Sequence, residues 1–358
     1  MIEINSDISH QNTKRLVWVD WAKAILIFLV VLGHSGSIFS PILYLFHIPA
    51  FFFVSGYLCN YSRNETGTLK SSRWMVYSIL LYNLGFILIN AIWANINGRG
   101  IFHAHSGTGW YEILLRPLIG IFWCYYKTSE HTNPLLAQFW FVWVLIILKW
   151  LYRYIYPFSI KNKFILVIGC ICFAIVTYHF NIRTFFYIDR TIIALPFFML
   201  GNMSNEYQLF TSKIGEVKGC NSATKAIISL VLLIGCTILG KYSGNLGVDM
   251  FHFRMGNSVI LYYILALAGT FSLILGCQAL PRVKIIELIS TGTFLILAIH
   301  LIIVQYLQDI IPDPTRIIIA SGIVLACVPV IQLIKNICPL LLGKKKSRIS
   351  KLISAPIK

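Results

Sequence analysis

An apolar stretch that follows Arg15 carries three ionisable side chains, Asp20, Lys23 and His34: Arg15-Leu-Val-Trp-Val-Asp20-Trp-Ala-Lys23-Ala-Ile-Leu-Ile-Phe-Leu-Val-Val-Leu-Gly33-His34. This stretch is long enough to cross the hydrocarbon core of a bilayer, which takes about 20 mostly apolar residues. Charged groups inside such a span are costly unless they face a polar cavity or a partner. The stretch therefore predicts a membrane helix with one functional face.

The three ionisable side chains share that face if the stretch is helical. Lys23 and His34 are eleven residues apart, which is about 3.06 helical turns, so they project within roughly 20° of each other and ~16 Å apart along the axis. Asp20 lies one turn before Lys23 and roughly 40° from the direction of His34. Two interpretations of Asp20 and Lys23 stay open: a self-neutralising ion pair near the interface, or the entrance for an anionic ligand.

Composition supports the membrane assignment for the whole chain. Of the 358 residues, 57% are hydrophobic and only 12% are charged, whereas soluble domains contain about 25% charged residues. The net charge of +17 would suit nucleic acid in a soluble protein, but the basic residues lie between hydrophobic runs and form no basic stripe interleaved with aromatics. A nucleic-acid partner is therefore not expected.

Apolar windows of spanning length predict an all-α integral membrane protein, a bundle of about ten transmembrane helices. The predicted spans lie near residues 16–36, 41–58, 74–96, 135–151, 164–180, 185–203, 223–240, 256–280, 285–308 and 317–342. The stretch 110–126 is also apolar, but Glu112, Arg116 and Pro117 interrupt it. An interfacial or re-entrant element is expected there.

The distribution of Lys and Arg predicts the orientation of these spans. With the N-terminus in the cytoplasm, the inner segments carry 21 basic residues and the outer segments carry 7. Both termini are therefore expected in the cytoplasm. The predicted organisation is a cytoplasmic segment 1–15, a transmembrane domain 16–343 with an extracytoplasmic insert at about 97–134, and a basic cytoplasmic tail 344–358.

Other polar residues inside the predicted spans are candidates for function or for structure. His47 precedes Pro49, so its imidazole either lines a site or bonds local backbone. Asp189 and Arg190 project about 100° apart on a helix, so Arg190 is either a clamp for an acceptor carboxylate or phosphate, or a member of an interhelical ion pair. His300 either lines a site or makes an interhelical hydrogen bond.

Three further features have simpler expectations. Ser55 and Gly56 are expected to allow close helix packing. Lys70 and Arg73, at the inner mouth of the third span, are either topology determinants or phosphate contacts. His103 and His105 have no carboxylate or cysteine nearby in the sequence, so no metal site is expected.

Several segments together resemble the acyltransferase 3 family of membrane O-acyltransferases. The opening motif, with its basic residue, ten-residue gap and histidine, is the most diagnostic of them. The segments are Arg15 to His34, His47-Ile-Pro49-Ala-Phe-Phe-Phe-Val-Ser55-Gly56-Tyr57, the pair Lys70 and Arg73, Phe139-Trp140-Phe141, and Thr293 with His300. Thr293 stands where the family usually has serine, and the tyrosine that commonly precedes the late histidine is absent.

The resemblance implies an enzyme that moves an acyl group, most simply acetyl, from cytoplasmic acyl-CoA to a hydroxyl of a cell-surface or lipid-linked polysaccharide. The expected catalytic residues are His34 as general base, with Asp20 and Lys23 at the donor entrance. Lys23, Lys70 and Arg73 would contact the CoA phosphates. The expected substrate-binding residues are His47, Trp140, Arg190 and His300.

The expected partners are acetyl-CoA or another acyl-CoA, a glycan or lipid-linked sugar, membrane lipids and, as an open alternative, a second copy of the chain. The expected location is the bacterial cytoplasmic membrane. The sequence leaves open an acetyl or a succinyl donor, and direct transfer or an acyl-histidine intermediate. A transporter or flippase with the same charges along its path is the alternative, although the sequence shows no pair of similar halves.

Overall fold

The computed structural model describes residues 15–59, 61–98, 109–123, 137–210, 221–307, 310–313 and 315–344. His103 and His105 lie outside the described residues. The regular elements within them are all helices. Their bounds are α1 (Val17–His34), α2 (Ser40–Leu58), α3 (Tyr61–Asn97), α4 (Arg116–Trp123), α5 (Trp140–Ile155), α6 (Ile160–His179), α7 (Ile188–Glu206), α8 (Ser222–Tyr242), α9 (Val259–Gln278), α10 (Lys284–Thr291), α11 (Thr293–Leu307) and α12 (Arg316–Ile337).

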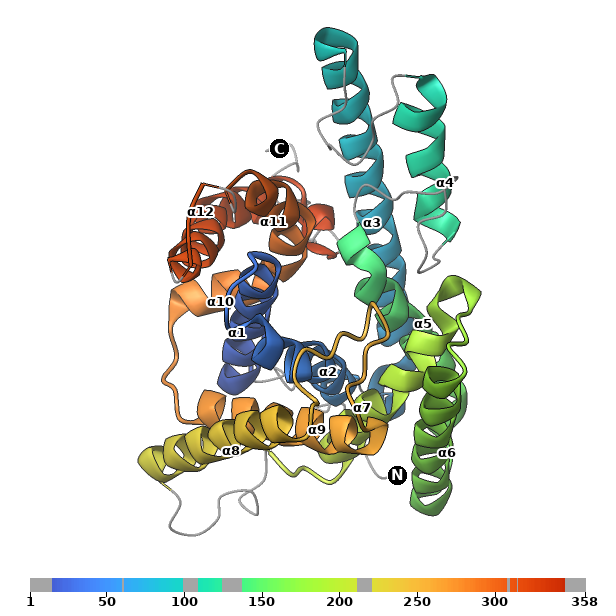
Figure 1. Cartoon of the computed structure of the whole chain (residues 1–358), viewed down its shortest axis with the longest axis vertical. Coiled ribbons are helices and arrows are strands. Elements are labelled where there is room, and N and C mark those ends of the chain that lie inside the picture. The colour runs from blue at the N-terminus through green and yellow to red at the C-terminus, as the bar shows by residue number, and fades with distance from the viewer. Residues whose placement is uncertain are drawn as a thin grey trace, which may run out of the picture.

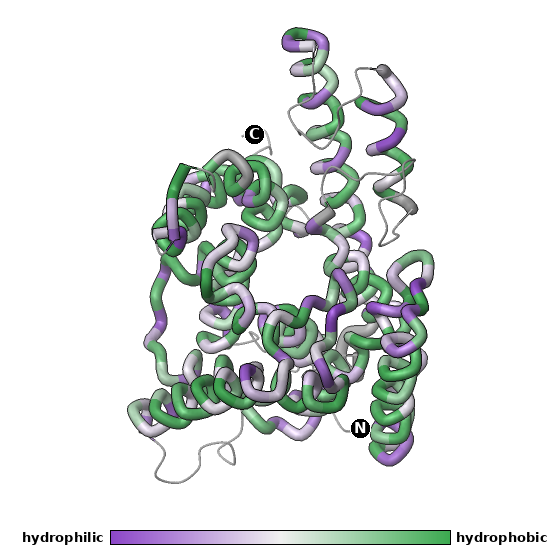
Figure 2. The backbone as a smooth tube through the Cα atoms, viewed as in Figure 1, coloured by the Kyte–Doolittle hydropathy of each residue, from purple (hydrophilic) through white to green (hydrophobic). Residues whose placement is uncertain are grey.

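Helix α1 lies among several others, packed against α2, α9, α10, α11 and α12. Helix α2 packs on α7 and α9, and α5 packs between α3 and α7, in contact with both (Figure 1). Helices α3 and α4 extend beyond the rest of the bundle at the top of this view. Apolar residues predominate along most helices (Figure 2). The polar residues of the first span are therefore enclosed by neighbouring helices.

Seven helices are long and apolar enough to cross a membrane: α1, α2, α3, α6, α8, α9 and α12. Helices α10 and α11 form a further candidate span that is bent by 75° at Gly292. The other two predicted spans correspond to α5, which has 16 residues, and to α7, whose sequence includes Asp189 and Arg190. The structure is thus an all-helical protein with seven or eight candidate spans, and ten spans stay a prediction.

The stretch predicted as interfacial or re-entrant forms two short elements. A π-helical turn at Tyr111–Leu115 leads directly into the eight-residue helix α4. Arg116 donates to Glu112 across 2.6 Å. The described part of this stretch is shorter than a span, and an interfacial or re-entrant element there stays a prediction.

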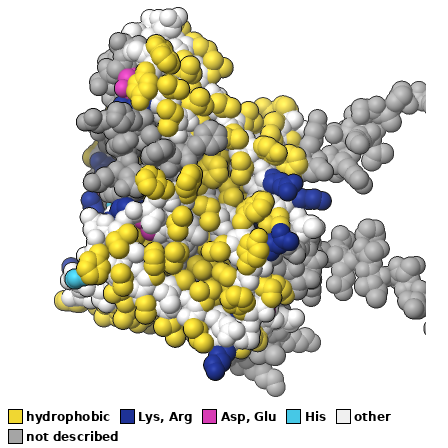
Figure 3. Space-filling model, turned by 90° about the vertical axis from the view of Figure 1, so that its right-hand side faces the viewer, with side chains coloured by type: hydrophobic (Ala, Val, Ile, Leu, Met, Phe, Trp, Pro, Cys, Tyr) yellow, Lys and Arg dark blue, Asp and Glu magenta, His cyan; other side chains and the backbone are white. Residues whose placement is uncertain are grey.

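Figure 3 shows apolar side chains covering much of the right-hand face of the molecule, with several Lys and Arg side chains at one edge. Such a band is expected of a surface that faces lipid. The end of the bundle at which α1 begins, predicted to be cytoplasmic, is called the inner end below. The end at which α1 finishes with His34 is called the outer end.

The contact between α2 and α7 depends on two glycines. A Cβ atom on Gly56 would lie 2.0 Å from the backbone oxygen of Phe198, and one on Gly201 would lie 2.0 Å from that of Phe53. Small residues let membrane helices approach this closely. The packing role predicted for Gly56 is confirmed.

Candidate functional site

A cavity of about 380 Å³ lies at the inner end between α1, α2, α3, α5, the start of α11 and the segment after α12. It is called the inner cavity here. Most of its polar lining consists of amines and hydroxyls. These residues are Lys23, Ser55, Thr68, Ser71, Lys149, Thr291, Thr293 and Lys344.

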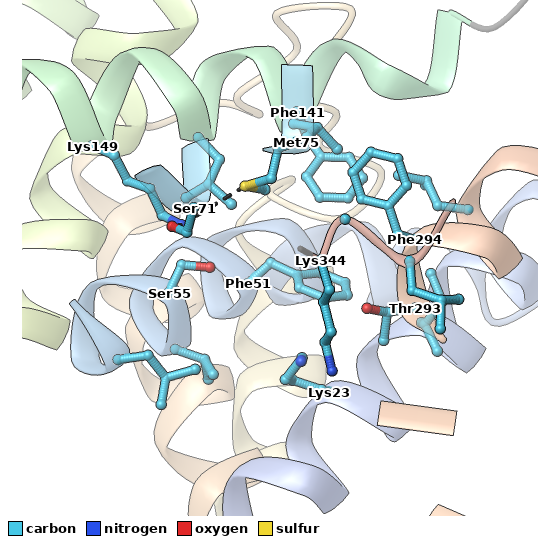
Figure 4. Close-up of a pocket in the computed structure, with 18 of the residues that line it drawn as sticks. Lys23, Phe51, Ser55, Ser71, Met75, Phe141, Lys149, Thr293, Phe294 and Lys344 are labelled. Atoms are coloured by element: carbon cyan, nitrogen blue, oxygen red, sulfur yellow. Dashed lines mark hydrogen bonds between the residues drawn. The ribbon is translucent and has the colours of Figure 1, made fainter. Parts of the chain in front are cut away.

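Three lysines from separate parts of the chain converge on the inner cavity. Figure 4 shows Lys23 and Lys344 extending toward each other, and Lys149 beside Ser71 and Met75. The Nζ atom of Lys149 lies 3.5 Å from the Ser71 hydroxyl. Among the described residues that line the cavity, none is an aspartate or glutamate. The inner cavity therefore suits an anionic ligand with several phosphate oxygens.

Lys70 and Arg73 do not line the inner cavity, although the family resemblance implied phosphate contacts for them. On α3 they are one residue before and two residues after Ser71, so they project about 100° and 200° away from it. Both side chains are exposed. Lys149 and Lys344 line the inner cavity in place of Lys70 and Arg73. The sequence marked Lys149 and Lys344 only as basic residues that predict the topology.

Asp20 is bound by Arg15 and Ser290 and makes no ion pair with Lys23 within the described chain. Arg15 donates from Nε to Asp20 across 2.5 Å and from Nη2 across 2.8 Å, and the Ser290 hydroxyl donates across 2.7 Å. The hydrogen bond to Asp20 and its negative charge raise the pKa of Arg15. The self-neutralising pair of Asp20 and Lys23 is thus not formed, and Asp20 joins α1 to α10.

His34, the last residue of α1, belongs to a cluster of aromatic rings at the outer end. Its ring centroid lies 5.2 Å from that of His300 on α11 and 6.3 Å from that of Tyr44 on α2. The Tyr44 ring lies a further 5.2 Å from His47. The structure thus brings together three histidines that are separated in the sequence.

Backbone carbonyls fix which ring nitrogen of two of these histidines is available. His300 donates from Nδ1 to the Leu297 carbonyl across 2.8 Å, and His47 donates from Nδ1 to the Leu43 carbonyl across 2.6 Å. In their neutral forms both rings therefore present Nε2 as an acceptor. The Nε2 atom of His300 is buried and has no hydrogen-bond partner among the described residues.

The inner cavity and His34 lie on the same side of α1, because both face α11. Ile27 and Leu297 line the cavity, and His34 is not part of it. From Ile27 to His34 is seven residues, or ~10 Å along the helix axis. His300 is less than one turn beyond Leu297 on α11. The inner cavity therefore lies on the side of α1 that carries His34, and on this helix its lining ends at Ile27, ~10 Å before the histidine.

The remaining predicted substrate-binding residues, Trp140 and Arg190, are buried. Trp140 packs against Phe251, with ring centroids 5.4 Å apart. Arg190 is fully buried, forms an ion pair with Asp189 and donates from Nη2 to the Phe251 carbonyl across 3.0 Å. Arg190 thus bonds protein groups on α7 and on the loop that follows α8, but its ion pair with Asp189 lies within α7 and is not the interhelical pair that the sequence predicted.

The segment 243–258 between α8 and α9, called the outer loop here, contributes a residue that the sequence did not identify. Asp249 in this loop accepts a hydrogen bond of 2.5 Å from Nδ1 of His252. Partial burial opposes ionisation, but the hydrogen bonds and charge of His252 outweigh it and lower the pKa of Asp249. Its hydrogen-bond partners lie within its own loop, but nothing in the local sequence pattern marked this carboxylate, because the position of the loop depends on contacts with α2, α6 and α7.

The family model described as an acyltransferase domain matches residues 16–335. No curated protein and no solved structure matches the chain. The matched range begins just before α1 and ends within α12, so it includes the inner cavity lysines Lys23 and Lys149 and the histidine cluster. By this match over nearly its whole length, the chain belongs to the acyltransferase 3 family of membrane acyltransferases.

Proposed function

We propose that this chain transfers an acetyl group from cytoplasmic acetyl-CoA to a hydroxyl of a cell-surface or lipid-linked polysaccharide at the bacterial cytoplasmic membrane, with His34 as general base. One observation carries the proposal: α1 connects a cavity lined by lysines at its inner end with a cluster of histidines at its outer end. A donor with phosphates and an acceptor with a hydroxyl can then meet along one helix face.

The donor side of the proposal rests on charge. Lys23, Lys149 and Lys344 present three ammonium groups to the inner cavity, and ammonium groups bind phosphate oxygens well. Helix α11 begins at Thr293, beside the cavity, so the positive end of its dipole adds to this field. The phosphates of CoA would bind here, and its linear pantetheine arm would extend along α1 toward His34.

The acceptor side of the proposal rests on the histidine cluster. The ring of His34 makes no hydrogen bond to other described residues, so a ring nitrogen is available to an incoming hydroxyl. In the proposed step, the acceptor oxygen bonds to the acyl carbon while its proton passes to His34. The bond between the acyl carbon and the CoA sulfur breaks, and the leaving thiolate takes that proton from His34. His300 and His47 would orient the ring and the acceptor through their Nε2 atoms.

The experiment measures transfer of labelled acetyl groups from acetyl-CoA by the purified protein to envelope glycans taken from cells that lack it. His34→Ala should lower kcat by about a hundredfold or more, because general-base catalysis contributes at least that much. His179→Ala, at the exposed outer end of α6, is the matched control and should retain activity. Full activity of His34→Ala would remove the proposed base.

A further inference from the structure

The outer loop is anchored to three different helices. Gly247 donates its backbone N–H to the Pro41 carbonyl on α2 across 3.3 Å. Arg190 on α7 donates to the Phe251 carbonyl, and Tyr178 on α6 donates to the Gly256 carbonyl across 3.0 Å. The loop crosses the front of the bundle in Figure 1. Its residues are therefore held at the outer end of the bundle.

The carboxylate of Asp249 has a fixed orientation within this loop. Its Oδ1 atom accepts the backbone N–H groups of Phe251 and His252 across 2.9 and 3.1 Å, and its Oδ2 atom accepts from the His252 ring. Its backbone pairs with that of Arg254 through two bonds of 2.7 and 2.8 Å. A charge held in this way does not have to reorganise during a reaction.

Asp249 faces the histidine cluster. Its carboxylate interacts electrostatically with His34 on α1, with Tyr44 and His47 on α2, and with Tyr262 on α9. The backbone bond from Gly247 to Pro41 also places this loop beside α2, because Pro41 precedes Tyr44 by less than one helical turn. The titratable or charged groups around the pair of Asp249 and His34 are His252, Arg254, Tyr44, His47, Tyr262 and His300.

We propose that Asp249 is a positioning residue for the transfer reaction, and that its carboxylate stabilises His34 as this histidine takes the proton of the acceptor hydroxyl. This inference rests on the proposed function. The proton transfer makes a cation in a partly enclosed site, where the free energy of a charge interaction is larger than in water. Asp249 supplies the opposite charge, and Arg190 holds the loop that carries it.

Asp249 remains ionised throughout the pH range of a kinetic experiment. Its pKa lies below the usual aspartate value, so its charge is complete above about pH 5 and would be lost only as the pH falls through its lowered pKa. Any change of rate between pH 5 and 8 therefore reports other groups, the histidines included. The effect of the Asp249 charge can therefore be measured in this range without any contribution from the titration of Asp249 itself.

The test is Asp249→Asn in the full chain, with acetyl-CoA as donor and the envelope glycans as acceptor. Asparagine retains an oxygen for the two backbone N–H groups, but it removes the charge and replaces Oδ2, which accepts from the His252 ring, with an amide nitrogen. We expect kcat to fall about tenfold, the size of a charge interaction across a protein site, while the KM for acetyl-CoA is unchanged. The acid limb of the kcat/KM profile should move to lower pH, because the carboxylate no longer favours the protonated imidazole.

Glu112→Gln is the matched control, since it also removes an acidic charge from the outer side but in the π-helical turn before α4. It should leave the rate and the pH profile unchanged. A lower rate of Asp249→Asn with an unmoved pH profile would assign Asp249 a purely structural role and overturn the inference. Wild-type kinetics would overturn it too. If Asp249→Asn behaves like wild type while His34→Ala is inactive, only this inference fails; if His34→Ala is active, the proposed base fails.

Discussion

The imidazole rings of His34 and His300 lie 5.2 Å apart between centroids, although one ends α1 and the other lies within α11. His300 is held by the Leu297 carbonyl, with its Nε2 atom buried. The Nε2 atom of His300 is thus an acceptor without a partner among the described residues, within the same cluster as His34. A ring N–H of His34 that bonded it would leave the other nitrogen of His34 basic toward an acceptor hydroxyl, because a neutral imidazole has one donor and one acceptor nitrogen.

We expect His300→Phe to lower kcat roughly 10- to 100-fold without changing the KM for acetyl-CoA. Phenylalanine fills the space but has no acceptor atom, so His34 would lose its orientation, and one hydrogen bond to a charged group is worth about that much. Steady-state kinetics at saturating donor would check it. His300→Gln, which retains an acceptor, should recover part of the loss. A wild-type kcat for His300→Phe would refute the pairing.

The lysines of the inner cavity should determine donor affinity. Lys149→Gln and Lys344→Gln should each raise the KM for acetyl-CoA about three- to tenfold with kcat nearly unchanged, because each removes one phosphate contact far from the reacting atoms. The effect should weaken at high salt. Lys161→Gln, which removes an exposed charge from the start of α6, is the control.

The same kinetics test whether the cavity lysines, or Lys70 and Arg73 as the family resemblance implies, bind the phosphates of the donor. Lys70→Gln and Arg73→Gln should raise the KM less than Lys149→Gln, since their side chains are exposed and project away from Ser71. A larger effect at Lys70 or Arg73 would place the phosphates outside the inner cavity.

The sequence allowed the first helix and the spacing of its ionisable residues along it to be predicted, because both are local properties. An apolar run of spanning length and a spacing of eleven residues between Lys23 and His34 need no tertiary information. The structure has α1 as one continuous helix from Val17 to His34. The same reasoning placed a span at α7, which stays a prediction, and the ion pair of Asp189 and Arg190 in that helix could not be predicted from the sequence.

The partners of the candidate residues could not be predicted in the same way. Asp20 bonds Ser290, and His34 faces His300, across the whole length of the chain. Lys344 reaches the inner cavity only because the segment after α12 folds back against it. Such contacts depend on how helices pack, and a single sequence does not contain that arrangement as a periodic pattern.

Asp20 should affect stability more than chemistry. Asp20→Ala leaves the buried Ser290 hydroxyl without its acceptor and, among the described residues, the Arg15 guanidinium with its contacts to Glu287 alone. This should lower the free energy of unfolding by about 1–3 kcal/mol. Thermal unfolding in detergent measures it. Arg282→Gln, which removes an exposed pair with Glu287 that contributes little, is the control.

Donor kinetics of the folded fraction separate the two roles of Asp20. With a structural role only, Asp20→Asn should keep the wild-type KM for acetyl-CoA per folded molecule. A raised KM in fully folded Asp20→Asn would instead support the donor entrance that the family resemblance implies.

The glycine contact between α2 and α7 should be the least tolerant position in the bundle. Gly56→Ala and Gly201→Ala each place a methyl group 2.0 Å from a backbone oxygen of the facing helix, so the helices must separate, at about 3 kcal/mol or more. Because α2 carries Tyr44 and His47, activity should fall together with thermal stability. Gly169→Ala on α6 has nothing within 4 Å of the added atom and should be neutral or stabilising, since alanine is the better helix former. Wild-type unfolding temperatures for both Gly56→Ala and Gly201→Ala would show that α2 and α7 do not pack this closely.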